Sequence, residues 1–166
     1  MIDAAYIQRM ARYNRWQNEN LYTVADGLSD DERRLDRGAF FGSIHGTLNH
    51  LLWGDRIWMS RFAGWPKPDC GARESPALIP DWNDLKQARI AADASLIDWA
   101  DRLDPDWIKA DLTWISGVTQ RVMTKPRWQL VTHFFNHQTH HRGQVHAMLT
   151  QAGGKPHDTD LFVMPE

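Results

Sequence analysis

The sequence predicts an all-α fold in which four long helices form a four-helix bundle. Its apolar residues recur mainly with the 3.6-residue period of an α-helix. Four long segments carry this period, and capping or breaking residues separate them. The chain has 166 residues, the length of one ordinary domain, so a single domain over residues 1–166 is expected. Hydrophobic residues make up 42% and charged residues 24%, which indicates a folded chain.

The first two long helices are predicted from apolar stripes and caps. One helix is expected from Asp3 to Leu28, and its stripe comprises Tyr6, Met10, Tyr13, Leu21, Val24 and Leu28, with Gln17 interrupting it. Ser29 followed by Glu32 is a capping-box pattern that predicts a short turn of helix. A second long helix is expected from Ser43 to Ala63, because Ser43 is a good N-cap and Gly64 follows the stretch.

The second half of the chain contains two more helices and a region of different character. The segment from Gly64 to Pro80 is expected to be a loop, and a helix should run from Asp81 to Leu103. Between Asp111 and Thr124, imperfect alternation fits a small β-hairpin before the last helix, with apolar residues Leu112, Trp114, Ile115, Val118, Val122 and Met123. The last helix is expected from Pro126 to Ala152, and the tail from Lys155 to Glu166 should lie on the surface.

Composition excludes several classes of function. The net charge is −2 and no run of Lys and Arg stands out, so neither nucleic acid nor an anionic membrane is an expected partner. No apolar run approaches the roughly 20 residues of a membrane span, and no signal peptide opens the chain, so a cytoplasmic location is expected. The single cysteine, Cys70, cannot form an internal disulfide and is interpreted as a bystander in the loop. Most of the nine tryptophans are expected to be packing residues.

Five of the eight histidines lie within residues 133–146: His133, His137, His140, His141 and His146. Four residues correspond to about 40° of rotation on a helix, so His133, His137 and His141 form one stripe. His137 and His141 can therefore bind one ion from adjacent turns, as in other helical His-x-x-x-His sites. His140 and His146 point further away and are weaker candidates.

A third ligand must come from another helix, and His50 is the best candidate. Gly46 and Gly54 lie one turn on either side of it, and each costs about 1 kcal/mol in a helix interior. Their positions suggest close approach by a helix or a ligand, which favours His50 over His45. With His137 and His141, three neutral imidazoles would leave a divalent ion with an open position, as in catalytic zinc sites. The alternative is that these histidines are packed core residues that bind no metal.

Three further residues are candidates for a supporting role. Asp55 lies about 140° from His50 on the helix, so it could orient a histidine only from a distance. A salt bridge is the favoured interpretation, with Arg142 as a suggested partner. Asn14 either faces the pocket or is solvated, and the pattern does not separate these alternatives. For His133 the alternatives are a fourth ligand, a proton carrier and a packed side chain, and a position near the metal without direct binding is favoured.

Several segments resemble the DinB/YfiT-like family of metal-binding proteins. They are residues 13–18 (Tyr-Asn-Arg-Trp-Gln-Asn), 44–55 (Ile-His-Gly-Thr-Leu-Asn-His-Leu-Leu-Trp-Gly-Asp), 135–144 (Phe-Asn-His-Gln-Thr-His-His-Arg-Gly-Gln) and 149–153 (Leu-Thr-Gln-Ala-Gly). The resemblance implies a DinB-like four-helix bundle that binds one zinc or nickel ion through a histidine of the second helix and two of the last. These positions correspond to His50, His137 and His141. It also implies a homodimer.

Members of the wider superfamily resembled here include bacillithiol S-transferases and a mycothiol-dependent maleylpyruvate isomerase. The resemblance therefore implies a metal-dependent enzyme in which a low-molecular-weight thiol attacks an electrophilic small-molecule substrate, in detoxification or stress response. Two alternatives stay open. One is a metal-dependent hydrolase that uses metal-bound hydroxide, with His133 carrying the proton. The other is a non-enzymatic, dimeric, metal-binding stress protein.

Overall fold

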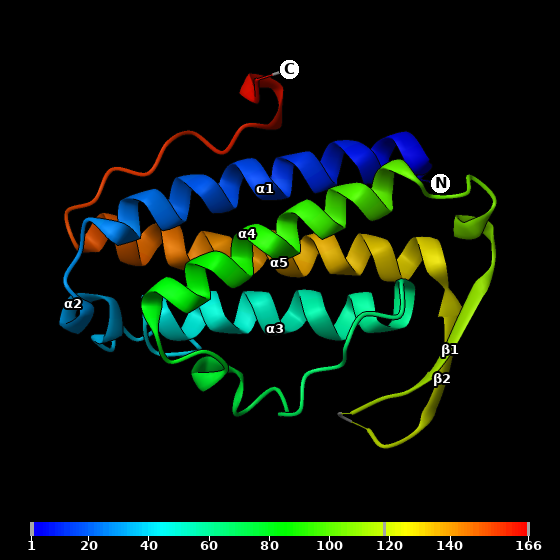
Figure 1. Cartoon of the computed structure of the whole chain (residues 1–166), viewed down its shortest axis with the longest axis horizontal. Coiled ribbons are helices and arrows are strands. Elements are labelled where there is room, and N and C mark those ends of the chain that lie inside the picture. Colours follow the sequence, from blue (N-terminus) through cyan, green and yellow to red (C-terminus); the bar gives the residue numbers. More distant parts are fainter. Residues whose placement is uncertain (1, 118, 166) are drawn as a thin grey trace.

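Four long helices make up most of the fold: α1 (Ala4–Asp26), α3 (Ile44–Phe62), α4 (Trp82–Asp101) and α5 (Arg127–Gln151). The structure, a computed structural model, describes residues 2–117 and 119–165. Helix α1 packs against α4 and α5, and α3 packs against the same two helices (Figure 1). The chain is therefore mostly helical, as the period of its apolar residues predicted.

The predicted starts of three long helices, α1, α3 and α4, are correct because each of these helices has a side-chain cap. The side chains of Asp3, Ser43 and Asp81 each accept a hydrogen bond from the backbone N–H three residues later, at 2.8–3.0 Å. These bonds satisfy backbone donors that have no partner within the helix. The predicted ends of two helices were late by two residues, since α1 ends at Asp26 and α4 at Asp101.

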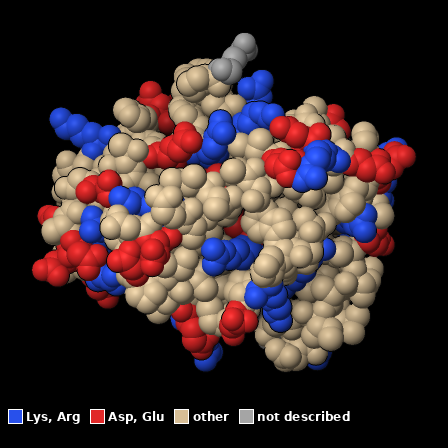
Figure 2. All heavy atoms as spheres, in the orientation of Figure 1, with Lys and Arg blue, Asp and Glu red and all other residues tan. Residues whose placement is uncertain are grey.

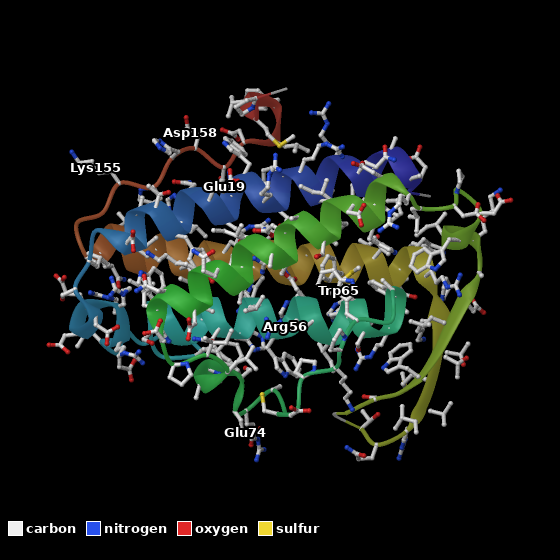
Figure 3. The ribbon with its side chains drawn as sticks, in the orientation of Figure 1. Glu19, Arg56, Trp65, Glu74, Lys155 and Asp158 are labelled. Carbon is white, nitrogen blue, oxygen red and sulfur yellow. The ribbon has the colours of Figure 1, made fainter. Side chains whose placement is uncertain are left out.

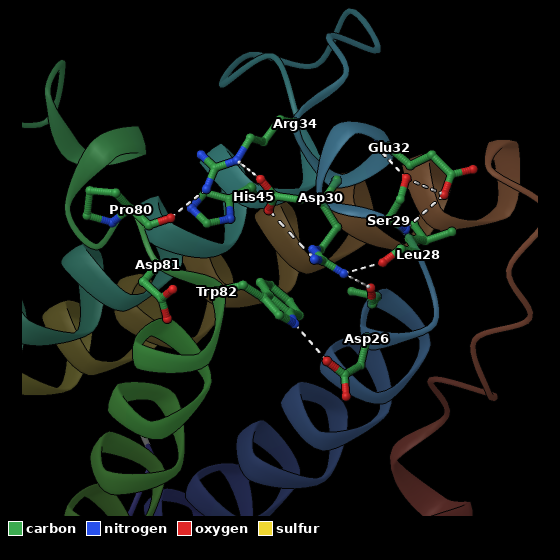
Figure 4. A network of polar contacts seen from close by, with 12 residues as sticks. Asp26, Leu28, Ser29, Asp30, Glu32, Arg34, His45, Pro80, Asp81 and Trp82 are labelled. Atoms are coloured by element: carbon green, nitrogen blue, oxygen red, sulfur yellow. Dashed lines mark hydrogen bonds and ion pairs between the residues drawn. The ribbon is translucent and has the colours of Figure 1, made fainter.

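The short helix α2 (Asp30–Arg34) lies in the connection between α1 and α3. Its predicted capping box is present, because Ser29 and Glu32 bond to each other's backbone N–H groups. Nearby, the indole N–H of Trp82 at the start of α4 donates to Asp26 at the end of α1, at 2.7 Å (Figure 4). These contacts hold the first turn of α4 against the last turn of α1.

The predicted hairpin is present between α4 and α5. Strands β1 (Asp111–Ile115) and β2 (Val122–Pro126) pair in an antiparallel sheet, with Asp111 opposite Pro126. The hairpin extends two residues beyond its predicted end at Thr124, so α5 begins at Arg127. Val118, which the hairpin prediction included, lies outside the described residues. Three short 3₁₀ helices are η1 (Ser75–Ala77), η2 (Trp107–Lys109) and η3 (Leu161–Val163).

The core consists of two apolar clusters with a buried polar layer between them. One cluster includes Leu21, Ile44, Leu48, Leu85 and Leu149, and the other includes Ile7, Met59, Leu96, Val131 and Phe134. Along all four long helices, buried polar residues fall between the two clusters: Asn14, Asn18, Asp55, Arg89, Asp93, Gln138 and Arg142. Each long helix therefore contributes polar groups that need partners away from water.

The predicted stripe on α1 is partly wrong because of this layer. Ile7 and Ala11 are fully buried, and Asn14 and Asn18 continue the same face inward. Predicted stripe members such as Met10 are only partly buried. The apolar pattern predicted a neighbouring face of α1 as the buried one, because the face that is buried carries Asn14 and Asn18.

The tail after α5 lies along α1 (Figures 1 and 3). The amide of Asn20 donates to the backbone carbonyl of His157 at 3.4 Å and accepts from its N–H at 3.0 Å. Gln17, expected only to interrupt a stripe, is buried and donates to the carbonyl of Asp158. The face in Figure 2 carries Lys and Arg mixed with Asp and Glu. No helix among the described residues combines the length and apolar character that a membrane crossing requires.

Candidate metal centre

The structure brings together three histidines that are distant in sequence. His50 comes from the middle of α3, and His137 and His141 come from adjacent turns of α5. One ring nitrogen from each lies within 4.8 Å of the other two. The Nε2 atoms of His50 and His137 are 3.1 Å apart. The antiparallel packing of α3 on α5 thus places the third histidine opposite the helical pair.

The spacing suits a divalent ion. Two nitrogens that each lie about 2.05 Å from a tetrahedral zinc are about 3.3 Å apart. The 3.1 Å separation of the Nε2 atoms of His50 and His137 is close to this value. The group consists of three imidazoles and contains no carboxylate. The group could hold a divalent metal ion, and the complex would keep a net charge of +2 because neutral imidazoles add no charge.

Neighbouring side chains fix which nitrogen of two rings carries the proton. The hydroxyl of Ser75 donates to the carbonyl of Ala72 at 2.7 Å and lies 2.8 Å from Nδ1 of His50. Because its proton is already used, Ser75 accepts from the Nδ1–H of His50. Likewise, Nδ1 of His141 lies 2.7 Å from the amide oxygen of Gln144. Both bonds leave the Nε2 lone pair free, as metal-bound histidines require.

Burial keeps the three rings neutral. Burial, together with the charge of neighbouring histidines, lowers the pKa of His50 and of His137 to about 3. Burial also lowers the pKa of His141, although the bond to Gln144 opposes this change. At physiological pH the neutral imidazoles have lone pairs that can bind a metal cation, whereas burial disfavours their protonation.

One of the two flanking glycines makes room for the site. A Cβ atom on Gly54 would lie 2.8 Å from Cε1 of His137, so only glycine lets this ring pack against α3. Gly46 has a different role, because a Cβ there would lie 2.7 Å from the backbone carbonyl of Phe41 in the preceding loop. His45 is buried, and its Nε2 bonds to a backbone carbonyl outside the group.

A cavity of about 580 Å³ adjoins the histidine group. His50 and His137 form part of its wall, and α3, α5, the loop after α3 and the hairpin enclose it. Three of the nine tryptophans line it: Trp53, Trp58 and Trp114. Its size is within the range of small-molecule sites. The histidine group is therefore reachable by a small molecule.

Two residues considered from the sequence lie in the wall of this cavity. The ring of His133 meets Trp58 edge to face at 5.2 Å between centroids, and lies 6.1 Å from the ring of His137. Its position is beside the three-histidine group, not within it. Cys70, interpreted as a bystander, also lines the cavity, and its carbonyl accepts from the indole of Trp53. No sequence spacing relates this loop cysteine to the histidines, so only the fold could place it there.

The sequence model of the DinB family matches residues 1–166. The chain belongs to the DinB family. It is also 27% identical to Protein DinB of Bacillus subtilis (strain 168), and the aligned region covers 98% of this chain and 95% of that protein. The family resemblance drawn from four segments of the sequence is thus confirmed over the whole chain.

The polar layer of this DinB chain contains a charge network that the sequence did not reveal. Asp55 forms a salt bridge, as favoured from the sequence, but its partner is Arg89 of α4, at 2.5 Å, and not the suggested Arg142. Arg89 also pairs with Asp93 at 2.8 Å, and all three side chains are at most 3% exposed. The suggested partner was wrong because Arg89 and Asp93 belong to α4, whose distance from Asp55 depends on helix packing.

Asn14 belongs to the same network. Its side chain is fully buried, accepts from the guanidinium of Arg142 and donates to Asp93 at 3.4 Å. Asn18 donates to the same carboxylate at 3.0 Å. Asn14 therefore neither faces solvent nor lines the cavity beside the histidines, and its contacts are with Arg142 of α5 and Asp93 of α4.

Proposed function

We propose that this DinB chain binds one divalent metal ion, zinc or nickel, through His50, His137 and His141. The convergence of three neutral imidazoles supports this proposal, because imidazole is a preferred ligand of both metals. The bonds from Ser75 and Gln144 hold two of the rings with Nε2 free. We further propose that residues 1–166 are a single domain whose four long helices form a four-helix bundle.

The proposed activity is transfer of a low-molecular-weight thiol to an electrophilic small molecule. The observation that carries this proposal is the cavity, whose wall includes His50 and His137. A zinc or nickel ion at the group would act as a Lewis acid that favours the thiolate form of a thiol. The protein itself orients the imidazoles, and the indoles of Trp53 and Trp58 give the cavity apolar walls that reduce access of water.

The first experiment measures metal content by mass spectrometry on protein purified without a His-tag. We expect about one zinc or nickel per chain, lost in His137→Ala. His140→Ala is the matched control, because His140 is on the same helix but outside the three-histidine group. Metal-free wild-type protein that also refuses added zinc and nickel would remove the basis of the proposal.

The second experiment tests the reaction. The cobalt-substituted protein is titrated with cysteine, glutathione and other small thiols, and conjugation is followed across a panel of electrophiles. A thiol-induced change in the cobalt spectrum and thiol-dependent conjugation are expected, and both should disappear in His137→Ala. If neither occurs while the metal stays bound, the transferase is wrong and metal binding stands.

Hydrolysis is a second candidate, favoured by His133. Burial and the charge of Arg61 lower the pKa of His133, so its ring is neutral at physiological pH and able to accept a proton. Its place in the cavity wall, beside His137, would suit a proton carrier. Turnover of ester or amide substrates without added thiol, reduced by His133→Gln, would favour the hydrolase over the transferase.

A further inference from the structure

We propose that the cavity binds a small organic acid, with its anionic group on Arg61, its apolar body between the tryptophans and its far end at the three histidines. This inference rests on the proposed function, because it names the class of substrate for that same site. The acid is either the electrophile or the thiol that attacks it. The arrangement of groups along α3 carries the argument.

Helix α3 presents one continuous wall to the cavity. His50, Ile57 and Arg61 are spaced by seven and four residues, so they share a helix face, and all three line the cavity. The eleven residues from His50 to Arg61 correspond to about 16 Å along the helix. Trp53 and Trp58 lie between them on the same wall. The cavity is therefore elongated, with the histidines at one end and a guanidinium at the other.

Arg61 is a cation without an internal counter-ion. Within residues 2–117 and 119–165, no carboxylate lies within ion-pair distance of it. Its guanidinium lies over Trp58 at 4.5 Å from the ring centroid and faces Trp114 at 5.8 Å. Arg61 is partly buried beside these rings, so its guanidinium has lost part of its hydration, and this burial lowers its pKa. A partly desolvated, preoriented guanidinium is a strong site for a carboxylate.

The other charges of the cavity do not replace Arg61. Lys67 and Asp69 line the same cavity, but both are exposed and of opposite sign. Solvent screens exposed charges, so this pair contributes little to selectivity. The remaining lining is mostly apolar, including Ile57, Trp58 and Trp114. The chemistry of the cavity therefore selects an anion joined to an apolar body.

The test compares 4-phenylbutyrate with its neutral analogue 4-phenylbutan-1-ol. Binding to the full chain is measured by tryptophan fluorescence and calorimetry, in the metal-loaded protein and after metal removal by chelation. We expect the acid to bind at least about tenfold more tightly than the alcohol in both forms, because an Arg–carboxylate pair is a charge-assisted hydrogen bond. Arg61→Gln should remove this preference, and Arg61→Lys should retain part of it.

Arg56→Gln is the matched control. Arg56, which is labelled in Figure 3, is also a half-buried arginine of α3, but it lines a different cavity. An equal loss of the preference for the acid in Arg56→Gln and Arg61→Gln would overturn the inference. A preference for the acid that disappears when the metal is removed, and that Arg61→Gln retains, would also overturn it. Metal content measured on the same samples keeps this outcome separate from failure of the metal site. A second comparison uses 6-mercaptohexanoate and hexanoate. Tighter binding of 6-mercaptohexanoate in the metal-loaded form only would show that the attacking thiol carries the anionic group. Equal binding of the two would assign the anionic group to the electrophile.

Discussion

Replacement of Gly54 by alanine should weaken metal binding without weakening the fold. The new Cβ would lie 2.8 Å from Cε1 and 3.2 Å from Nδ1 of His137. Relief to an ordinary carbon contact of about 3.5 Å moves the ring by about 0.7 Å. Metal–ligand distances tolerate only about 0.2 Å. We therefore expect zinc affinity to fall by about tenfold to a hundredfold in Gly54→Ala, a loss of about 1.4–2.8 kcal/mol.

Helix propensity predicts the opposite effect on stability. Alanine is favoured over glycine by about 1 kcal/mol in a helix interior, so metal-free Gly54→Ala should unfold in urea at the same concentration as the wild type or a higher one. Gly143→Ala is the control, because no atom lies within 4 Å of its added Cβ and its metal affinity should be unchanged. Zinc competition with a chromophoric chelator measures the affinities. Wild-type affinity in Gly54→Ala would refute the argument that this glycine makes room for His137 at the metal.

Three other predictions follow from named contacts. Ser75→Ala removes the acceptor of the Nδ1–H of His50 and should lower zinc affinity about tenfold in the same chelator assay, whereas unchanged affinity would show that the tautomer needs no such partner. Burial raises the pKa of Asp55 to about 6, above about 3.9 in an unfolded chain, so its contribution to stability is fully present below pH 4 and is lost as the pH rises through 6. Asp55→Asn should therefore make the unfolding free energy of metal-free protein rise more steeply between pH 4 and 6 than in the wild type, in which the lowered pKa values of His50 and His137 already make it rise. Parallel curves would mean that Asp55 titrates normally. Asn20→Ala removes both bonds to the backbone of His157, so hydrogen exchange of the His157 amide should accelerate at least tenfold while core amides stay protected, and equal protection would mean that other contacts hold the tail.

Much of the fold could be predicted because its signals are local. Caps at Asp3, Ser43 and Asp81 define where helices begin, since each side chain bonds only three residues ahead. The hairpin was predicted despite weak alternation, because it is short and adjacent in sequence. The inward face of α1 was misjudged, since buried Asn14 looks polar until its partners on other helices are known.

The candidate site divides in the same way. The four-residue spacing of His137 and His141 places both rings on one side of a helix, and the glycine before Asp55 pointed to a close approach that proved to be the ring of His137. Sequence reasoning could select His50 from the same helix. It could not find Ser75 or Arg61, because neither has a fixed spacing to the histidines.

By itself, the sequence determined the helices, their caps, the hairpin and the three histidines that could share an ion. Only the tertiary structure decided that the Nδ1 atom of His50 bonds to Ser75, that Asp55 pairs with Arg89, and that Arg61 lies in the same cavity as the histidines. The physical reason is the distance along the sequence over which each interaction acts. Helical period and capping depend on neighbours within about four residues, whereas contacts between helices depend on how whole apolar faces pack.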